Sequence, residues 1–301
     1  MAETERVNVG IIGYTGRTGM ELQELLENHP RINMVYYEKS DGWKGRIDDA
    51  DFLFLAVDAE TSLKKVPQLF EQKKKIIDMS GAYRLPQEKF KKWYKIKHTS
   101  PELTAKAVYG LPEINREEIK NASFAANPGC YATAILLALY PVRNYTRNIH
   151  IDATSGISGA GKYPIPDGSI KPYAPFREHK HVPEIEFLLE KEIAFYPQVN
   201  EAQDRGITAI IHYDTKIPCD NKIPDVEKKL KIFYENEKFV KFGVEHNIAK
   251  KNSCYLSVEQ KGKTVRIISE IDNLRKGAAS QAIQNFNLMY GFEESAGLKI
   301  T

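Results

Sequence analysis

The residues best suited to chemistry in this 301-residue chain lie between positions 122 and 139. The run 122–126 predicts a short buried strand, the run 132–139 predicts an apolar helix, and Asn127-Pro128-Gly129 predicts a turn between them. The thiol of Cys130 would then lie in the first turn of the helix, where the helix dipole favours the thiolate. Thiolate is the nucleophilic form of cysteine, so the pattern indicates covalent sulfur chemistry. A small buried cysteine is the alternative.

Two histidines could exchange a proton with such a nucleophile. His179 and His181 lie in a loop before a predicted helix, not in an apolar strand. Histidine is the usual acid or base at neutral pH, so these two are the candidates, with a pair of solvated imidazoles as the alternative. The His-x-His spacing also suits a metal, but the sequence offers no third ligand nearby, so we expect no metal site.

Further polar, turn-rich segments could bind a substrate. Arg84 and Arg205 could each hold a phosphate or carboxylate as a bidentate partner, or lie on the surface. The segments are 80–84 after a predicted strand, 109–113 before the cysteine strand, 155–161 as a flexible loop after the strand 149–152, and 179–185 before a helix.

The start of the chain predicts an element that binds a dinucleotide. A β run at 7–12 leads into Gly13-Tyr14-Thr15-Gly16, and apolar residues at helical spacing follow from Met20. Thr18 and Glu21 could form a capping box. In dinucleotide-binding folds such a turn lets the backbone approach a pyrophosphate at the helix start. A plain βα turn without a ligand is the alternative.

Alternating elements predict the architecture around this turn. Strands at 32–37, 52–57 and 75–78, with a helix around 63–70, favour a doubly wound parallel sheet that binds ligands at its carboxyl edge. The ribose preference stays open. Glu38 could bind a 2′-hydroxyl and favour NAD, whereas a cluster of cationic and hydroxyl side chains could hold the 2′-phosphate of NADP. That cluster consists of Lys39, Ser40, Lys44 and Arg46.

Composition excludes several classes of partner. A net charge of +3 argues against nucleic acid or an anionic membrane as the partner, and the sequence has no apolar run of the ~20 residues that a membrane span needs. The polar first six residues argue against a signal peptide. Three widely spaced cysteines make neither a disulfide framework nor a zinc site, so we expect a reducing, cytoplasmic setting.

A reactive cysteine beside a nicotinamide favours one reaction type. The thiolate attacks an activated acyl group and expels the leaving group, and the resulting thioester accepts hydride to give an aldehyde. These motifs occur together in a known family, and the chain resembles N-acetyl-gamma-glutamyl-phosphate reductase of the arginine pathway, with aspartate-semialdehyde dehydrogenase as a related fold. The matching runs are 13–16, 108–113, 126–131, 155–161, 179–185 and 272–289.

The resemblance implies a fold and a domain division. It implies an α/β protein with a Rossmann-type doubly wound parallel domain at 1–128 plus 277–301, where a tail helix at 277–290 returns to pack. An α+β catalytic and dimerisation domain with a mixed sheet would occupy 129–276. The family assembles as dimers or tetramers, so we expect a homodimer or homotetramer.

The resemblance also implies roles for single residues. Cys130 would be the acyl-thioester nucleophile and His179 the acid/base, with His181 as the second choice. NADPH would reduce an acyl phosphate, and NAD is not excluded because Glu38 replaces a small hydroxyl residue. The predicted substrate-binding residues are Ser80, Arg84, Asn127, Ser155, His181 and Arg205. The predicted cofactor-binding residues are Gly13, Tyr14, Thr15, Gly16, Lys39, Ser40, Gly159 and Asn285.

Two alternative functions remain at this point. The same chemistry could act on the lysine-pathway aminoadipyl analogue, because the run 195–201, which faces the substrate in the family, departs from the family pattern. The run 80–84 also departs from it by lacking an acid that would make a local hydrogen bond. A non-catalytic, nucleotide-binding redox sensor that uses Cys130 as a switch is the second alternative, and Arg84 and His179 beside the cysteine motif weigh against it.

Overall fold

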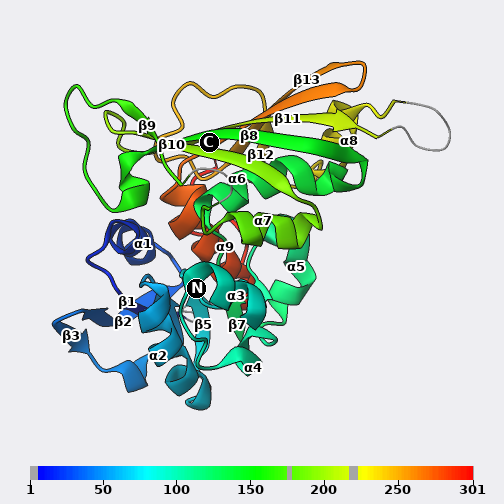
Figure 1. Cartoon of the computed structure of the whole chain (residues 1–301). Coiled ribbons are helices and arrows are strands. Elements are labelled where there is room, and N and C mark those ends of the chain that lie inside the picture. The colour runs from blue at the N-terminus through cyan, green and yellow to red at the C-terminus, as the bar shows by residue number, and fades with distance from the viewer. Residues whose placement is uncertain (1–5, 175–177, 217–222, 301) are drawn as a thin grey trace. The chain divides into compact units, whose positions relative to one another are not determined.

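The computed structural model describes residues 6–174, 178–216 and 223–300. The chain divides into two compact units, each containing one seven-stranded sheet (Figure 1). Unit 1 comprises Met1–Gly129 and Ala278–Lys299, and unit 2 comprises Cys130–Gly277 with the last two residues. The predicted α/β class, with one doubly wound sheet and one mixed sheet, is confirmed.

The sheet of unit 1 has the strand order β3-β2-β1-β4-β5-β7-β6. Its strands pair in parallel except for the short β3, which runs antiparallel to β2 at the edge. The strands are β1 (Val7–Ile12), β2 (Ile32–Lys39), β3 (Gly42–Gly45), β4 (Phe52–Leu55), β5 (Lys75–Asp78), β6 (Val108–Tyr109) and β7 (Phe124–Ala126). The order reverses between β1 and β4, and in open parallel sheets this is where ligands bind.

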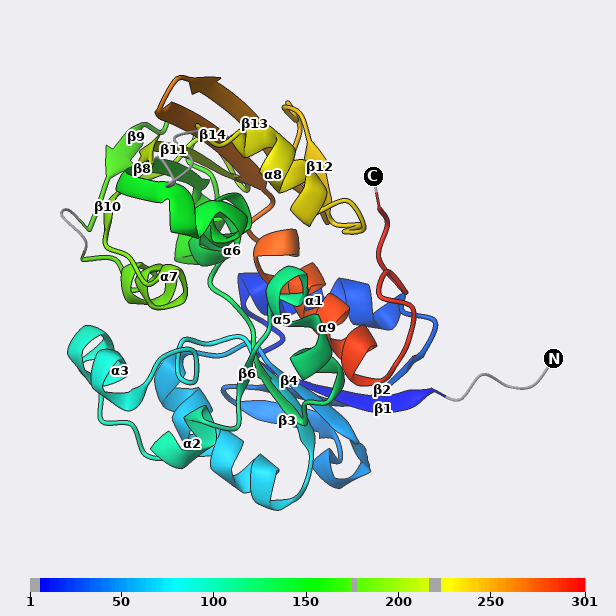
Figure 2. The ribbon, with the colours of Figure 1, turned by 90° about the vertical axis from the view of Figure 1, so that its right-hand side faces the viewer.

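The apolar run of β4 explains why this sheet is covered on both faces. Leu53 and Leu55 belong to the core beneath α2, whereas Phe52 and Phe54 contact the ring of Phe286 in α9. Figure 2 shows helices on both sides of the sheet. A strand buried on both faces reads as a continuous apolar run because neither side faces water.

The helices of unit 1 connect its strands. They are α1 (Arg17–Glu27), α2 (Ala59–Glu71), α3 (Gln87–Tyr94), α4 (Pro101–Thr104), α5 (Pro112–Lys120) and α9 (Ser280–Met289). The predicted capping box is wrong: α1 begins at Arg17 with Gly16 as its N-cap, so Thr18 lies inside the first turn and its side chain does not cap the helix.

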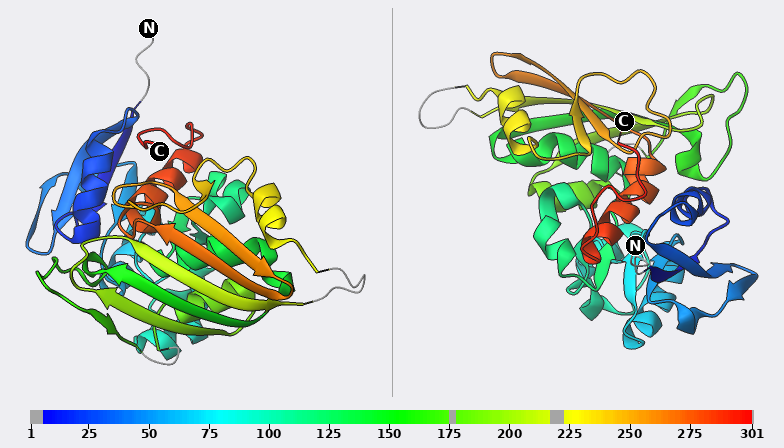
Figure 3. Two further views of the ribbon diagram at one scale, coloured as in Figure 1. Left: turned by 90° about the horizontal axis from the view of Figure 1, so that it is seen from above. Right: turned by 180° about the vertical axis from the view of Figure 1, so that it is seen from behind.

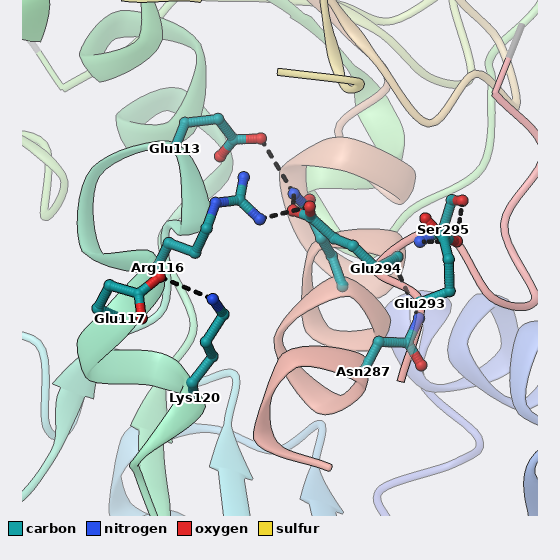
Figure 4. A network of polar contacts seen from close by, with 9 residues as sticks. Glu113, Arg116, Glu117, Lys120, Asn287, Glu293, Glu294 and Ser295 are labelled. Carbon is teal, nitrogen blue, oxygen red and sulfur yellow. Dashed lines mark hydrogen bonds and ion pairs between the residues drawn. The ribbon is translucent and has the colours of Figure 1, made fainter. Parts of the chain in front are cut away.

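The C-terminal segment is fixed to unit 1 by a polar network (Figure 4). The amide of Gln284 in α9 donates to Glu113 in α5 at 3.1 Å and to Glu294 in the tail at 2.6 Å. Arg116 pairs with the same Glu294. The network joins α5, α9 and the tail, so the last helix is an integral part of unit 1.

Unit 2 is built on a mixed sheet of order β12-β13-β14-β11-β8-β10-β9. Its strands are β8 (Thr146–Gly156), β9 (Ile170–Pro172), β10 (Ile193–Asn200), β11 (Ile207–Thr215), β12 (Val240–Phe242), β13 (Cys254–Lys261) and β14 (Thr264–Ile271). Its helices are α6 (Cys130–Leu139), α7 (Val182–Leu189) and α8 (Val226–Phe233). The apolar α6, buried from Tyr131 onward, packs on β11, β13 and β14. Figure 3, left, shows the opposite face of the strands.

The predicted loop at 155–161 is largely ordered secondary structure. Strand β8 continues to Gly156, and Ile157–Ala160 forms a 3-10 turn. A serine- and glycine-rich run reads as a loop, but β8 is held in the sheet by β10 and β11 on either side. Gly156 allows this because a Cβ there would lie 2.6 Å from the carbonyl oxygen of Asp204.

Candidate active site

The glycine turn after β1 has the geometry that a dinucleotide requires. Gly13 has a φ of +89°, and a Cβ at this position would overlap the carbonyl oxygen of Ala56. All residues of α1 are described, and its first turn carries no acidic side chain and no side-chain cap. A helix start of this kind stabilises a bound phosphate through its N–H groups and its dipole. The residues present therefore fit a pyrophosphate.

The neighbouring turn residues are arranged around that helix start. Thr15 and Gly16 are exposed, and the Tyr14 ring contacts Tyr37 edge-on with centroids 5.8 Å apart. Gly19 has the tightest surroundings, since a Cβ there would overlap the carbonyl oxygen of Gly13. The sequence reading missed Gly19, although its three-residue spacing from Gly16 was a signal for close helix–strand packing.

The end of β2 carries the groups expected to face the ribose. Lys39 forms an exposed ion pair with Asp41 at 2.9 Å, and Ser40 is exposed. The carboxylate of Glu38 is half-buried and accepts hydrogen bonds from Lys65 and, at 2.7 Å, from the Tyr36 hydroxyl. Its partners are therefore protein groups.

The predicted substrate residues Ser80 and Arg84 of unit 1 form hydrogen bonds with other groups of the protein. The Ser80 hydroxyl donates to the buried Asp78 at 2.8 Å and accepts from the N–H of Ala82. The guanidinium of Arg84 donates to the carbonyls of Asn127 and Met79, each at 2.7 Å. Burial raises the pKa of Asp78, opposed by its bonds to Ser80 and by the charge of Arg84. These side chains fix the turn after β5.

Asn127 is a connector within unit 1. Its side-chain amide donates to the carbonyl of Ala278 at 3.1 Å, and its side-chain oxygen accepts from Asn285 at 3.1 Å. Asn285, predicted to bind cofactor, is fully buried in α9 and also donates to the carbonyl of Gly110 at 2.8 Å. Both amides thus hold the segment leading into Cys130, and isolated motifs could not reveal this.

Cys130 is the first residue of α6 and is partly exposed. The thiol therefore lies where the sequence predicted it, at a helix start. Gly277 lies against this residue, since a Cβ there would be 2.9 Å from the Cβ of Cys130. A larger residue at 277 would push the cysteine from its place.

Both candidate imidazoles contact Tyr131, the residue next to the cysteine. The Tyr131 ring meets His179 edge-on at 5.3 Å between centroids and His181 at 6.0 Å. The two histidine rings are 4.7 Å apart. Unit 2 therefore brings His179 and His181 together with the start of α6.

The hydrogen bonds of His179 define its protonation. The backbone N–H of His181 donates to Nδ1 of His179 at 3.1 Å, so a neutral ring carries its proton on Nε2. Burial, together with the nearby His181, lowers the pKa of His179 to about 3, and Glu184 opposes the shift. At neutral pH this imidazole is uncharged and can donate a hydrogen bond from Nε2.

An aromatic shell around these histidines was missed by the sequence reading. The Tyr173 hydroxyl donates to that of Tyr131 at 3.2 Å, and the Tyr131 hydroxyl donates to the carbonyl of Gln198. The rings of Tyr173 and Phe195 both contact His179. Burial raises the pKa of Tyr173 to about 12. Tyr131 could have been singled out because it follows Cys130, whereas the other two gave no sequence signal.

The remaining predicted residues of unit 2 occupy two places. Ser155 is buried near the Tyr131 hydroxyl, and the exposed Gly159 lies beside it. Arg205, predicted to bind an anion, instead pairs with the buried Asp272 at 3.3 Å. A guanidinium whose charge is already matched is a poor first candidate for a substrate anion.

Comparison with known proteins decides the family. The chain is 36% identical to the N-acetyl-gamma-glutamyl-phosphate reductase of Methanosphaera stadtmanae, and the match covers 98% of each chain. It is equally similar, with the same coverage, to the enzyme of that name from Clostridium novyi. The chain belongs to the N-acetyl-gamma-glutamyl-phosphate reductase family. It is an enzyme, and the predicted family and oxidoreductase class are confirmed.

The family models divide the chain in agreement with this assignment. Residues 42–122 match the NAD binding domain of semialdehyde dehydrogenases, and residues 130–273 match their dimerisation domain. A nicotinamide-dinucleotide-binding domain and a propensity to oligomerise are therefore established for this reductase.

Solved structures support the fold. Aspartate semialdehyde dehydrogenase II from Vibrio cholerae covers 95% of the chain with a TM-score of 0.71 at 18% identity, and 99% of that protein is matched. Aspartate semialdehyde dehydrogenase with NADP from Candida albicans matches with a TM-score of 0.69 at 12% identity, and the match covers the same shares of both chains. Such low identity shows the fold alone.

The described residues contain no group of three or more His, Cys, Asp or Glu residues that could hold a metal ion. Within the same residues, no helix has the length and apolar character needed to cross a membrane.

Proposed function

We propose that this reductase converts N-acetyl-gamma-glutamyl phosphate to N-acetylglutamate 5-semialdehyde and phosphate with NADPH, in arginine biosynthesis. The observation that carries the proposal is the partly exposed Cys130 at the start of α6, followed by a tyrosine whose ring contacts two histidines. The names of the full-length relatives support the substrate.

The covalent step belongs to Cys130. Its thiolate attacks the acyl carbon, the bond from that carbon to the phosphate oxygen breaks, and phosphate leaves with the electron pair. NADPH supplies the hydride that reduces the thioester carbon. The carbon–sulfur bond then breaks, the aldehyde forms and the thiolate returns. The one proton consumed comes from solvent and ends on the released phosphate.

His179 supports this chemistry as a neutral ring. Its Nε2 proton is available to hydrogen-bond the acyl oxygen as negative charge develops there, the kind of stabilisation that acyl transfer requires. A pKa near 3 makes this imidazole a weak base before substrate binds. We therefore propose that His179 acts first as a hydrogen-bond donor to the acyl oxygen, and not as the acid or base predicted from the sequence.

The cofactor proposal is NADP. The turn at Gly13–Gly16 and the start of α1 would hold the pyrophosphate, and Lys39 with Ser40 would face the 2′-phosphate. The fit of that turn to a phosphate supports the first assignment. The exposed cation and hydroxyl at the end of β2 support the second.

A single assay tests substrate and cofactor together. N-acetylglutamate semialdehyde and phosphate are offered with NADP or NAD, and formation of the reduced cofactor is followed by absorbance. We expect turnover that requires phosphate, with NADP preferred. The aminoadipyl semialdehyde is the competing substrate, and faster turnover with it would overturn the proposed substrate.

Replacement of the nucleophile tests the mechanism. Cys130→Ser should retain NADP binding, measured by calorimetry, and lose nearly all phosphate-dependent turnover, because an alcohol is a far weaker nucleophile than a thiolate. Substantial turnover in this variant would exclude the thioester route.

We also propose that the reductase forms a homodimer or homotetramer through the open face of the unit 2 sheet. The register places Tyr196, Asp152, Ile210 and Ile268 in one row across β10, β8, β11 and β14. These side chains belong to the alternate set facing away from the core, and Tyr196 is 39% exposed. The need for a reduced Cys130 supports a cytoplasmic setting.

A further inference from the structure

Glu38 is the last residue but one of β2, near the position from which an acidic residue usually binds the ribose hydroxyls of NAD. The glycine turn is hydrogen-bonded to this residue: the backbone N–H of Gly13 donates to the backbone carbonyl of Glu38 at 2.7 Å. Any charge on Glu38 therefore acts close to the proposed cofactor site. A carboxylate here would repel the 2′-phosphate of NADP.

The carboxylate of Glu38 is paired within unit 1. Lys65 donates to one oxygen, and the Tyr36 hydroxyl donates to the other at 2.7 Å. The Glu38 side chain is only 14% exposed and that of Lys65 is 32% exposed, so water screens the pair less than it screens a surface pair. The ammonium therefore compensates most of the charge on Glu38.

The position of Lys65 is set by a rigid element. It lies in α2, whose neighbouring residues Leu63 and Val66 are buried against the sheet. Asp58 caps this helix by accepting from the N–H of Thr61 at 2.9 Å. The lysine is thus brought to the end of β2 by packing that does not depend on a bound cofactor.

We propose that Lys65 determines cofactor specificity by neutralising Glu38, so that the site accepts a 2′-phosphate despite carrying the acid typical of NAD sites. This inference rests on the proposed use of NADP. The role is electrostatic: Lys65 acts on Glu38, and Lys39 and Ser40 remain the residues proposed to contact the phosphate.

The test is a double-mutant cycle read out by binding. Lys65→Met, Glu38→Gln and the double variant are prepared, with Lys64→Met as the control, since Lys64 is the exposed neighbour on the same helix. Affinities for 2′,5′-ADP and 5′-AMP are measured by calorimetry, and their ratio reports the preference for the 2′-phosphate. Thermal melts verify folding, and Lys65→Gln replaces Lys65→Met if the latter melts early.

Each variant has a distinct expected result. Lys65→Met should lower the ratio about tenfold, because it leaves a carboxylate beside a phosphate at reduced dielectric. Glu38→Gln should raise the ratio, and the double variant should return it to within roughly twofold of wild type because both charges are then absent. Lys64→Met should leave it unchanged.

Other results overturn the inference. If the affinity ratio of the double variant is as low as that of Lys65→Met, Lys65 contacts the phosphate itself. If Lys65→Met weakens both ligands equally, the pair only supports the fold. The wild-type ratio separately tests the proposed cofactor, since a wild type that binds 5′-AMP as tightly would refute NADP use, whereas the shifts among variants would still test the role of the pair.

Discussion

At the scale of single residues, the site of unit 2 combines a sulfur nucleophile with a desolvated imidazole. The rings of Tyr131, Tyr173 and Phe195 contact His179, which is half-buried. Burial penalises the charged form, so the ring stays neutral and keeps its Nε2 hydrogen for a hydrogen bond. The aromatic shell therefore sets the protonation state on which the proposed chemistry depends.

Substitution of each imidazole separates their roles. His179→Ala should reduce turnover by about 10²–10³-fold, the usual cost of removing one hydrogen-bond donor to a developing oxyanion, with cofactor affinity unchanged. His181→Ala should have a smaller effect, since its backbone N–H, which fixes the His179 ring, is retained. Steady-state kinetics with both variants measure this. A larger loss of turnover in His181→Ala would make His181 the hydrogen-bond donor to the acyl oxygen.

The shifted pKa of His179 also predicts how stability depends on pH. The imidazole has a pKa of about 3 in the folded state and 6.5 as its ordinary value. Between these values the unfolded chain binds more protons, so stability is complete above about pH 6.5 and falls as the pH drops towards 3. His179→Gln should lose less stability than wild type between pH 7.5 and 5, as measured by urea unfolding.

The comparison with the variant isolates this histidine. Burial also lowers the pKa of His29 and His98, which contribute in the same direction in both proteins. An equal loss of stability in wild type and His179→Gln would show that His179 is not desolvated.

At the scale of elements, the glycines after β1 differ in what they do. Gly13 allows the turn to contact Ala56 after β4, and Gly19 allows α1 to contact the turn. The nearest atom to a Cβ at Gly16 would be 3.8 Å away. Gly16 is therefore free for a ligand to approach, and Gly19 holds the helix against the turn.

A matched pair of alanine substitutions tests this difference. Gly19→Ala should destabilise the reductase by roughly 2–3 kcal/mol, because the added carbon meets backbone that cannot move aside. Gly16→Ala should leave the melting temperature nearly unchanged and weaken only dinucleotide binding. Calorimetric melts and NADP titrations measure both. Equal melting temperatures would contradict the assigned packing role of Gly19.

At the scale of the whole molecule, the open face of the unit 2 sheet is the surface that we propose for assembly. In β11 and β14 every second residue is buried, and the intervening residues, Ile210 and Ile268 among them, face outward in register. Within the described part of unit 2, these apolar side chains lie on the face opposite α6. A second copy of the chain is the partner that the match to a dimerisation domain supports.

One charge placed on this face tests the assembly. Ile210→Glu should dissociate the oligomer into monomers, because the acid would be buried opposite an apolar surface. Ile232→Glu is the control, since Ile232 is 60% exposed on α8. Light scattering after size exclusion gives the masses. An unchanged oligomer in Ile210→Glu would place the interface elsewhere.

The sequence by itself determined the elements and the chemistry carried by single motifs. The glycine turn, five of the strands of unit 1 and the helix starting near Cys130 follow from local propensity and periodicity, which neighbouring residues alone decide. The short strands β3 and β6 were not predicted. The resemblance was sound for the same reason, because its motifs are contiguous.

Only the tertiary structure decided which polar groups are already satisfied. Arg84, Asn127, Asn285 and Arg205 were predicted to contact ligands, yet their partners lie mostly on other elements. The Lys65–Glu38 pair joins a helix to a strand in the same way. Hydrogen bonds and ion pairs between residues distant in sequence depend on how the elements pack, and local sequence patterns do not predict them.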